Sequence, residues 1–189
     1  MILLIYAYGS SVLRKESEEI DKNYPGLEKL INDMFETMDN AKGIGLAASQ
    51  IGKNIRVIVV DTKSMAEDFP DDGLDDFREV FINPIIEEEF GDEFSFREAC
   101  LSLPRISEEI KRPSKIIMSY FDKDWNFHEK EFTGIKCRIL QHEYDHLEGR
   151  MWIDRVSPLK KKLLSSKLDR ITKGDVYFDY PIKFPKEKF

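Results

Sequence analysis

Hydrophobic positions in the first half of the chain follow two different periods. Between residues 27 and 38 they recur every three or four positions, which predicts an amphipathic helix with one face in a core. The β-branched run RVIVVD at residues 56–61 predicts a buried strand. Residues 64–79 are acidic and include Pro70 and Gly73, so we expect an exposed loop there. The opening MILLIYAYG is apolar but lacks a basic leader, which indicates a strand and not a secretion signal.

The middle of the chain predicts further strands followed by a helix. Strands are expected at residues 80–86, 115–122 and 126–132. A turn near Asp124 joins the last two of them. In the helix that follows, Thr133 is placed to cap the start and Gly149 to end it.

The C-terminal part of the chain differs in charge from the rest. Ser157 and Pro158 stand in the order that begins a helix, which we expect to end near Gly174, and the aromatic residues 176–184 indicate a final strand. Residues 155–189 carry 10 Lys and Arg against 4 Asp and Glu, a balance of +6. Since the whole chain carries −7, the first 154 residues carry −13. This acidic body argues against general or sequence-specific nucleic-acid binding, while the basic tail is either a solvated helix face or a docking surface.

The composition is that of a soluble globular protein, with 41% hydrophobic and 34% charged residues. No apolar run approaches the ~20 residues that a membrane span needs, so no membrane contact is expected. The two cysteines do not form a disulfide framework, and a reducing cytoplasm is the expected compartment.

A pentapeptide with the chemistry of a metal site lies in the predicted helix at residues 133–149. His142 and His146 are four positions apart, so both imidazoles point to one side of the helix. Two imidazoles provide half of a tetrahedral metal site, and Glu143 beside them can accept a proton from water. Ile135 and Ile139 fall on the same stripe as the histidines. The alternative is a surface helix whose histidines are merely solvated.

A catalytic metal usually has three protein ligands, so the chain should supply one more. The extended pattern His-Glu-x-x-His-x-x-Gly-x-x-His matches at Gly149 but places Trp152, which cannot ligate, at the last position. A glutamate from a following helix is a second pattern, but residues 160–175 contain only Asp169 and Asp175 as acids. The third possibility is that a cysteine thiolate, which suits zinc or iron, is the missing ligand.

The two cysteines differ in their relation to the histidines. Cys137 is five residues before His142, which places it about 140° away around the helix, so we expect it to pack as a small apolar residue. Cys100 has no such constraint, because it lies outside the helix. A buried structural cysteine is the alternative for Cys100.

Taken together, the elements predict an α+β fold of mostly antiparallel strands around a central metal-bearing helix. We expect residues 1–189 to form a single catalytic domain that ends in a basic helix and strand at 157–189.

Three segments together resemble the peptide deformylase family. They are GIGLAASQ at 43–50, EACLS at 98–102 and QHEYDHL at 141–147. The family's motifs are Gly-x-Gly-x-Ala-Ala-x-Gln, Glu-Gly-Cys-x-Ser and Gln-His-Glu-x-Asp-His, in the same order. The likeness runs from residues 12–15 through residue 160 and so covers most of the chain. It implies an α+β hydrolase that removes the formyl group from the N-terminal formyl-methionine of new bacterial polypeptides.

The resemblance also implies a ligand set and an ion. Cys100, His142 and His146 would hold one divalent metal ion, with Fe(II) expected in the cell and zinc, nickel or cobalt as alternatives in purified protein. Glu143 would be the general acid and base. The implied partners are formyl-methionyl nascent peptides. The basic tail adds a hypothesis of transient contact with the ribosome.

Further roles follow from the same resemblance. Gln50 and the backbone N–H of Leu101 would polarise the formyl oxygen, and the backbone of Ile44 and Gly45 would hold the peptide in a strand-like pose. The methionine pocket and its supporting contacts would involve Glu98, Arg138 and Ile139.

The chain departs from the family's motifs at a few positions. Ala99 replaces the usual glycine before the ligand cysteine, and a positive φ there would cost about 1 kcal/mol. Ser10-Ser11 replaces a common Asp-Pro, and Ser49 stands where proline is frequent.

Two other functions stay open on the residues alone. One is a metallopeptidase of another family, which would need a third ligand other than Cys100. The other is a non-catalytic binding protein, against which the presence of Glu143 and Gln50 argues.

Overall fold

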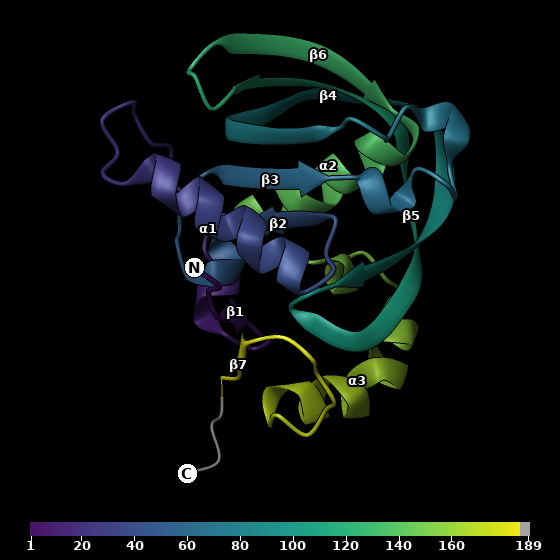
Figure 1. Cartoon of the computed structure of the whole chain (residues 1–189). Coiled ribbons are helices and arrows are strands. Elements are labelled where there is room, and N and C mark those ends of the chain that lie inside the picture. Colours follow the sequence, from purple (N-terminus) through teal and green to yellow (C-terminus); the bar gives the residue numbers. More distant parts are fainter. Residues whose placement is uncertain (186–189) are drawn as a thin grey trace.

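The computed structural model describes residues 1–185 and contains a five-stranded antiparallel sheet (Figure 1). In spatial order its strands are β2 (Gly45–Ala47), β3 (Val57–Asp61), β4 (Arg78–Cys100), β5 (Leu103–Phe121) and β6 (Phe127–Thr133). The α-helices are α1 (Leu27–Asn40), α2 (Gly134–Leu147) and α3 (Pro158–Thr172). The predicted α+β fold of mostly antiparallel strands is confirmed. None of the helices within residues 1–185 is long and apolar enough to cross a membrane.

Strand β3 separates two layers of core. Successive side chains of a strand point to opposite faces. Val57 and Val59 therefore pack in one cluster with residues of α1, while Ile58 and Val60 pack in another with residues of α2. The helices α1 and α2 lie on opposite sides of β2 and β3 (Figure 1). The fully apolar run is explained by this burial on both faces, which confirms the strand predicted at residues 56–61.

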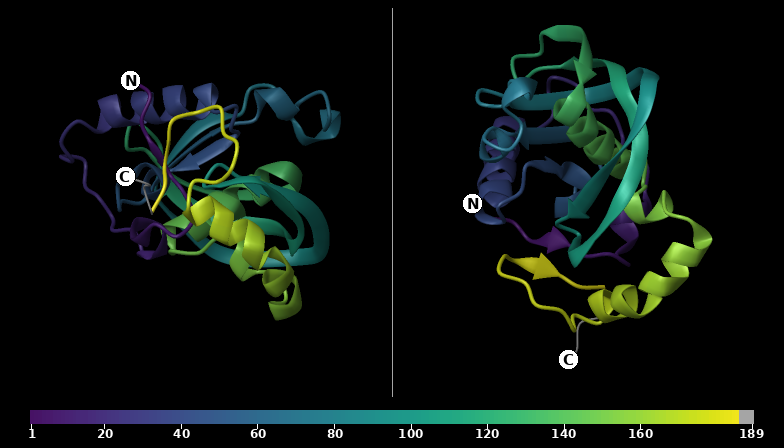
Figure 2. Two further views of the ribbon diagram at one scale, coloured as in Figure 1. Left: turned by 90° about the horizontal axis from the view of Figure 1, so that it is seen from below. Right: turned by 90° about the vertical axis from the view of Figure 1, so that its right-hand side faces the viewer.

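The strands β4 and β5 form a hairpin much longer than predicted. The strand expected at 80–86 continues to Cys100, and the one expected at 115–122 already begins at Leu103. Residues 87–114 carry many charged side chains, most of them exposed on a ribbon that curves around α2 (Figures 1 and 2). Cross-strand pairing holds the exposed, charged part of the hairpin together, which is why the apolar pattern did not predict it.

The start of helix α2 is capped from a distant loop. Thr133 stands at the N-cap with extended backbone, but its side chain accepts no hydrogen bond there. The Ile135 backbone N–H instead donates to Asp72 Oδ2 at 2.7 Å. The prediction was correct in the position of the cap and wrong in the side chain that supplies it. At the other end Gly149 has a φ of +66°, a conformation that favours glycine after a helix.

The predicted final strand is mostly absent from the described residues. Only β7 (Ile182–Lys183) is a strand, and it pairs in parallel with β1 (Ile5–Tyr6) near the start of the chain. The exposed loop expected at 64–79 includes two short 3₁₀ turns, and its apolar residues Leu74 and Phe77 are buried. The basic helix α3 begins after Ser157, whose Oγ accepts a hydrogen bond from the Lys160 backbone N–H at 3.3 Å.

We predict that Asp72→Ala lowers the free energy of unfolding by about 1 kcal/mol, because the first turn of α2 loses its side-chain acceptor. Thr133→Ala should change it by less than about 0.5 kcal/mol, since the Thr133 side chain bonds no helix N–H. Urea unfolding of the two variants measures both effects. A larger loss in Thr133→Ala than in Asp72→Ala would contradict this account of the cap.

Candidate metal centre and active site

Three side chains from two elements meet beneath the hairpin. Cys100 ends strand β4, and His142 and His146 lie one turn apart on α2. One potential ligand atom from each lies within 4.8 Å of the other two, and Cys100 Sγ is 3.3 Å from His146 Nε2. The donor set of one sulfur and two imidazoles suits a metal ion such as zinc or iron.

A buried carboxylate orients the first histidine. Glu98 Oε2 lies 2.9 Å from His142 Nδ1, and both carboxylate oxygens of Glu98 also accept hydrogen bonds from the Arg112 guanidinium at 2.6 and 2.8 Å. With Nδ1 donating to Glu98, Nε2 of His142 is the nitrogen that faces Cys100 and would bind a metal ion. Burial opposes charge on the ring, but hydrogen bonds with Cys100 and Glu98 raise the pKa of His142 well above its ordinary value.

The ion pairs continue through α2. Arg112 Nη1 donates to Asp145 Oδ2 at 2.7 Å, and Arg155 also binds Asp145 with two hydrogen bonds of 2.6 Å. Arg138 donates to Glu98 Oε1 at 3.0 Å. Sequence reasoning gave no role to Arg112, Asp145 or Arg155. Asp145 stands in the third motif, but nothing local marks a lone arginine in a strand as the partner of a helix. It named Arg138 only as a pocket residue.

The two cysteines lie in opposite electrostatic environments. Burial alone would raise the pKa of the Cys100 thiol, but His146 and His142 lower it to about 5, which favours the thiolate form that binds metals. Cys137 lies on the other side of α2, with Sγ 3.8 Å from the Pro113 carbonyl oxygen. Burial raises the pKa of Cys137 to about 12. The structure therefore separates Cys137 from the histidines, as the helical spacing predicted, and places Cys100 beside them.

Glu143 is buried next to the cluster, and Gly45 makes room for it. A Cβ at Gly45 would lie 2.5 Å from Glu143 Oε1, so any larger residue at this position of β2 would displace the Glu143 carboxyl. Glu143 Oε2 has no hydrogen-bond partner within residues 1–185. Burial raises the pKa of the Glu143 carboxyl above its ordinary value. A carboxyl with a free oxygen and a raised pKa is suited to accept and release a proton.

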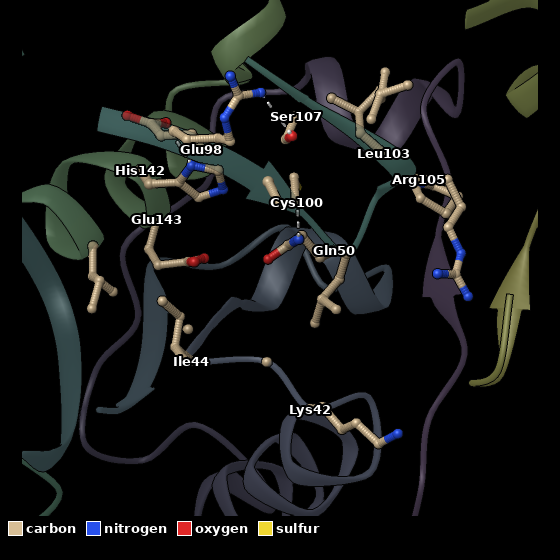
Figure 3. A pocket seen from close by; sticks show the side chains of 18 of the residues that line it. Lys42, Ile44, Gln50, Glu98, Cys100, Leu103, Arg105, Ser107, His142 and Glu143 are labelled. Atoms are coloured by element: carbon tan, nitrogen blue, oxygen red, sulfur yellow. Dashed lines mark hydrogen bonds and ion pairs between the residues drawn. The ribbon is translucent and has the colours of Figure 1, made fainter. Parts of the chain in front are cut away.

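Gln50 and Leu101 are the next neighbours of Cys100. Gln50 Nε2 is 3.6 Å from Cys100 Sγ and 3.2 Å from Ser102 Oγ, while its Oε1 accepts a hydrogen bond from the Ala47 backbone N–H at 2.9 Å. This last bond fixes the amide so that its NH2 faces the cysteine (Figure 3). Leu101 follows in the tight turn between β4 and β5.

These residues line a cavity of about 710 Å³. His142 and Glu143 lie on one side of it and Arg105 on the other (Figure 3). The wall also includes all five residues that were predicted to bind substrate, namely Ile44, Gly45, Glu98, Arg138 and Ile139. Two of these, Glu98 and Arg138, are almost fully buried and bonded to each other, so they support the wall and offer little surface of their own.

The backbone of Ile44 and Gly45 lies at the edge of the sheet, because β2 is its first strand. The Ile44 carbonyl accepts a hydrogen bond from the Asp61 N–H at 2.9 Å and so faces β3. In an antiparallel pair neighbouring residues present their backbone groups to opposite sides. Gly45 therefore directs its N–H and C=O to the open edge. Ala99, where positive φ was considered, has no left-handed backbone, so its Cβ adds no strain of that kind.

Comparison with known proteins is consistent with this geometry. The sequence model of the polypeptide deformylase family matches residues 2–162. A peptide deformylase of Cytophaga hutchinsonii is 46% identical over 188 residues, which is 100% of each chain. One from Christiangramia forsetii is 46% identical over 193 residues, covering 100% of this chain and 98% of that protein.

Solved structures give the same result. A crystal structure of a peptide deformylase from Legionella pneumophila superposes with a TM-score of 0.78 at 35% identity, covering 90% of this chain and 95% of that one. Peptide deformylase from Thermotoga maritima gives a TM-score of 0.74 at 36% identity, covering 84% and 99%.

The contrast between the cysteines gives a prediction. Cys100→Ala should lose bound metal and activity, because one of three ligands is removed. Cys137→Ala should keep both and lose about 1 kcal/mol of stability, because it only packs. Metal analysis of the two purified variants measures the difference. Metal loss in Cys137→Ala alone would show that the ligand is assigned to the wrong cysteine.

Proposed function

The chain belongs to the polypeptide deformylase family and removes the N-terminal formyl group from nascent polypeptides in a metal-dependent hydrolysis; we propose that Cys100, His142 and His146 hold the metal ion and that Glu143 transfers the protons. The observation that carries the proposal is the cluster of Cys100, His142 and His146 at the edge of a cavity whose wall includes Cys100, His142 and the buried Glu143 carboxyl. All of residues 1–189 would form one catalytic domain, and the compartment would be the bacterial cytoplasm.

A bound divalent ion supplies Lewis-acid activation of water and of the formyl oxygen. The residues of the chain do the rest. Glu143 accepts the proton of the attacking water and then donates it to the nitrogen of the leaving amine. Its burial supports both steps. Burial raises the pKa of the Glu143 carboxyl toward neutral pH, and a carboxyl with a higher pKa holds the accepted proton until the leaving amine takes it.

The formyl oxygen would accept hydrogen bonds from Gln50 Nε2 and from the Leu101 N–H, which stabilise the negative charge that develops there. Such a donor is typically worth about 3–4 kcal/mol. The peptide would add to the open edge of β2 as an extended strand, with the N–H and C=O of Gly45 as its partners. Ile139 would contribute to the pocket for the methionine side chain, supported from behind by Glu98 and Arg138.

For the ion itself we propose Fe(II) in the cell, with zinc, nickel or cobalt able to replace it in purified protein. A thiolate with two imidazoles suits both iron and zinc, and the family resemblance favours iron. For partners beyond the peptide, we propose a transient contact of α3 with the ribosome, whose phosphate-rich surface would attract the lysines of this helix.

We predict that Glu143→Ala leaves the metal content unchanged and lowers kcat on formyl-Met-Ala-Ser by about 10²–10⁴-fold, because the proton carrier is lost. Glu143→Gln, which keeps the size of the side chain beside Gly45, should show the same loss. Glu88→Gln, on the exposed part of β4, serves as the control and should keep activity. Near-normal kcat in metal-replete Glu143→Gln would refute the assigned role.

The proposed ion predicts sensitivity to oxygen. Protein loaded with Fe(II) without air should be more active than the zinc form and should lose activity on aeration, by oxidation of the iron or of the Cys100 thiolate. Nickel and cobalt forms should be more durable. Activity of the forms before and after aeration, with metal content measured each time, decides between iron and zinc. Iron-loaded activity that survives air unchanged would favour zinc.

Ribosome contact is tested best at lysines without ion pairs. Lys160 and Lys161 bind Glu108 and Asp154, so reversing their charge would also disturb the fold. Lys162 and Lys167 are exposed and have no acidic partner in residues 1–185. The double variant Lys162→Glu, Lys167→Glu should weaken co-sedimentation with ribosomes at low salt and leave tripeptide turnover unchanged.

The matched control reverses two exposed lysines elsewhere, Lys22→Glu and Lys53→Glu, and should sediment like the wild type. Equal loss in both double variants would mean that only net charge matters. Unchanged sedimentation of the α3 variant, or none of the wild type, would refute the proposed contact.

A further inference from the structure

The turn that carries Leu101 is held by both ends of the chain. It joins β4 to β5, and two successive carbonyl groups in it accept hydrogen bonds from distant donors. The Tyr8 backbone N–H donates to the Ser102 carbonyl oxygen at 2.8 Å. The Tyr180 hydroxyl donates to the Leu101 carbonyl oxygen at 2.7 Å. Tyr180 lies beyond residue 162, where the match to the family's sequence model ends.

The segment that carries Tyr180 is part of the cavity wall. Residues 177–180 all line the cavity. On one side the Tyr177 ring packs beneath the Arg105 guanidinium, with the Arg105 Cζ 4.5 Å from the ring centre. On the other side Asp179 Oδ2 lies 3.8 Å from Lys42 Nζ, just before the first motif. The segment thus spans the cavity from the start of β5 to the loop after α1.

The segment is also anchored independently of the Tyr180 hydroxyl. The Ile5 N–H donates to the Pro181 carbonyl oxygen at 3.0 Å, and the Ala7 N–H donates to that of Lys183 at 2.8 Å. Phe178 packs against Phe184 with ring centres 5.3 Å apart. Removing only the hydroxyl should therefore leave the segment in place.

We propose that Tyr180 is a positioning residue for the reaction. Its hydroxyl fixes the Leu101–Ser102 peptide, which is joined at the Leu101 Cα to the peptide that carries the Leu101 N–H, and so helps to hold that N–H in the direction where charge develops on the formyl oxygen. This inference rests on the proposed role of Leu101 as a donor. A backbone donor in a turn contributes most when it is already oriented before the reaction, because no reorganisation is then needed. The Leu101 side chain is confined too, since a Cβ at Gly43 would lie 2.8 Å from its Cδ1.

The test removes one hydroxyl in each of two tyrosines. Tyr180→Phe breaks the bond to Leu101 and keeps the ring. Tyr120→Phe is the matched control, because its hydroxyl donates to Glu79 Oε2 at 3.1 Å and the residue lies outside the cavity. Both variants, Gln50→Ala and the wild type are assayed on formyl-Met-Ala-Ser, with kcat, KM, metal content and thermal midpoint measured for each.

We expect Tyr180→Phe to lower kcat about three- to tenfold with KM within about twofold of the wild type, as for an interaction that matters only in the transition state. Its metal content should be unchanged, and its thermal midpoint should fall no further than that of Tyr120→Phe. Tyr120→Phe should keep kcat. A wild-type kcat in Tyr180→Phe overturns the inference, and so does a loss that appears in KM alone.

Lost metal, or a thermal midpoint well below that of Tyr120→Phe, would make the role of Tyr180 structural and would also overturn the inference. Gln50→Ala separates the inference from the proposed function. If Gln50→Ala loses activity and Tyr180→Phe does not, the formyl oxygen is polarised as proposed and Tyr180 is not needed. If neither variant loses activity, the proposed donors themselves are wrong.

Discussion

The buried carboxylate of Glu98 is the constraint on which the site depends. It is 4% exposed and binds Arg112, Arg138 and His142 at once, so one side chain of β4 connects β5 with two positions of α2. Burial alone would raise the pKa of Glu98, but the hydrogen bonds from Arg112 and His142 hold it far below its ordinary value. A charge of this kind is tolerated only when it is fully paired, because removing one partner of a buried ion pair costs about 3–5 kcal/mol.

The same network fixes the position of β4 relative to α2, although the two elements are far apart in the sequence. Cys100 lies two residues after Glu98 on β4, and His146 follows Asp145 on α2. Because Arg112 binds both Glu98 and Asp145, the strand that ends in Cys100 and the helix that carries both histidines are fixed to one side chain. Buried ion pairs are weak evidence of stability, since apolar residues can replace them. Their value here lies in the direction they give to His142, whose Nε2 is turned toward Cys100.

Prediction from the sequence was correct where the determining pattern is local. The periodicity of 27–38 predicted α1, the apolar run at 56–61 predicted β3, and the spacing of the histidines placed both on one face of α2. Prediction was wrong or incomplete where a residue far away in the sequence determines the local structure. The cap of α2 comes from Asp72, and β7 is a strand only because β1 lies beside it. The motif residues were found as a set by resemblance, whereas the Arg112 network has no local pattern.

The chemistry of a side chain in this protein is set by what surrounds it, as the two cysteines make plain. Both are buried cysteines without a disulfide; Cys100 ends β4 and Cys137 lies on α2. Burial alone would raise the pKa of Cys100, but the two imidazoles beside it bring the pKa down to about 5, so this sulfur gives up its proton more easily than an ordinary thiol. Cys137 has the Pro113 carbonyl oxygen and apolar side chains beside it, and burial raises its pKa to about 12. A metal ion offered both thiols would meet a thiolate only at Cys100. The selection therefore follows from the fold and not from the residue type, since the fold alone decides which cysteine faces the histidines.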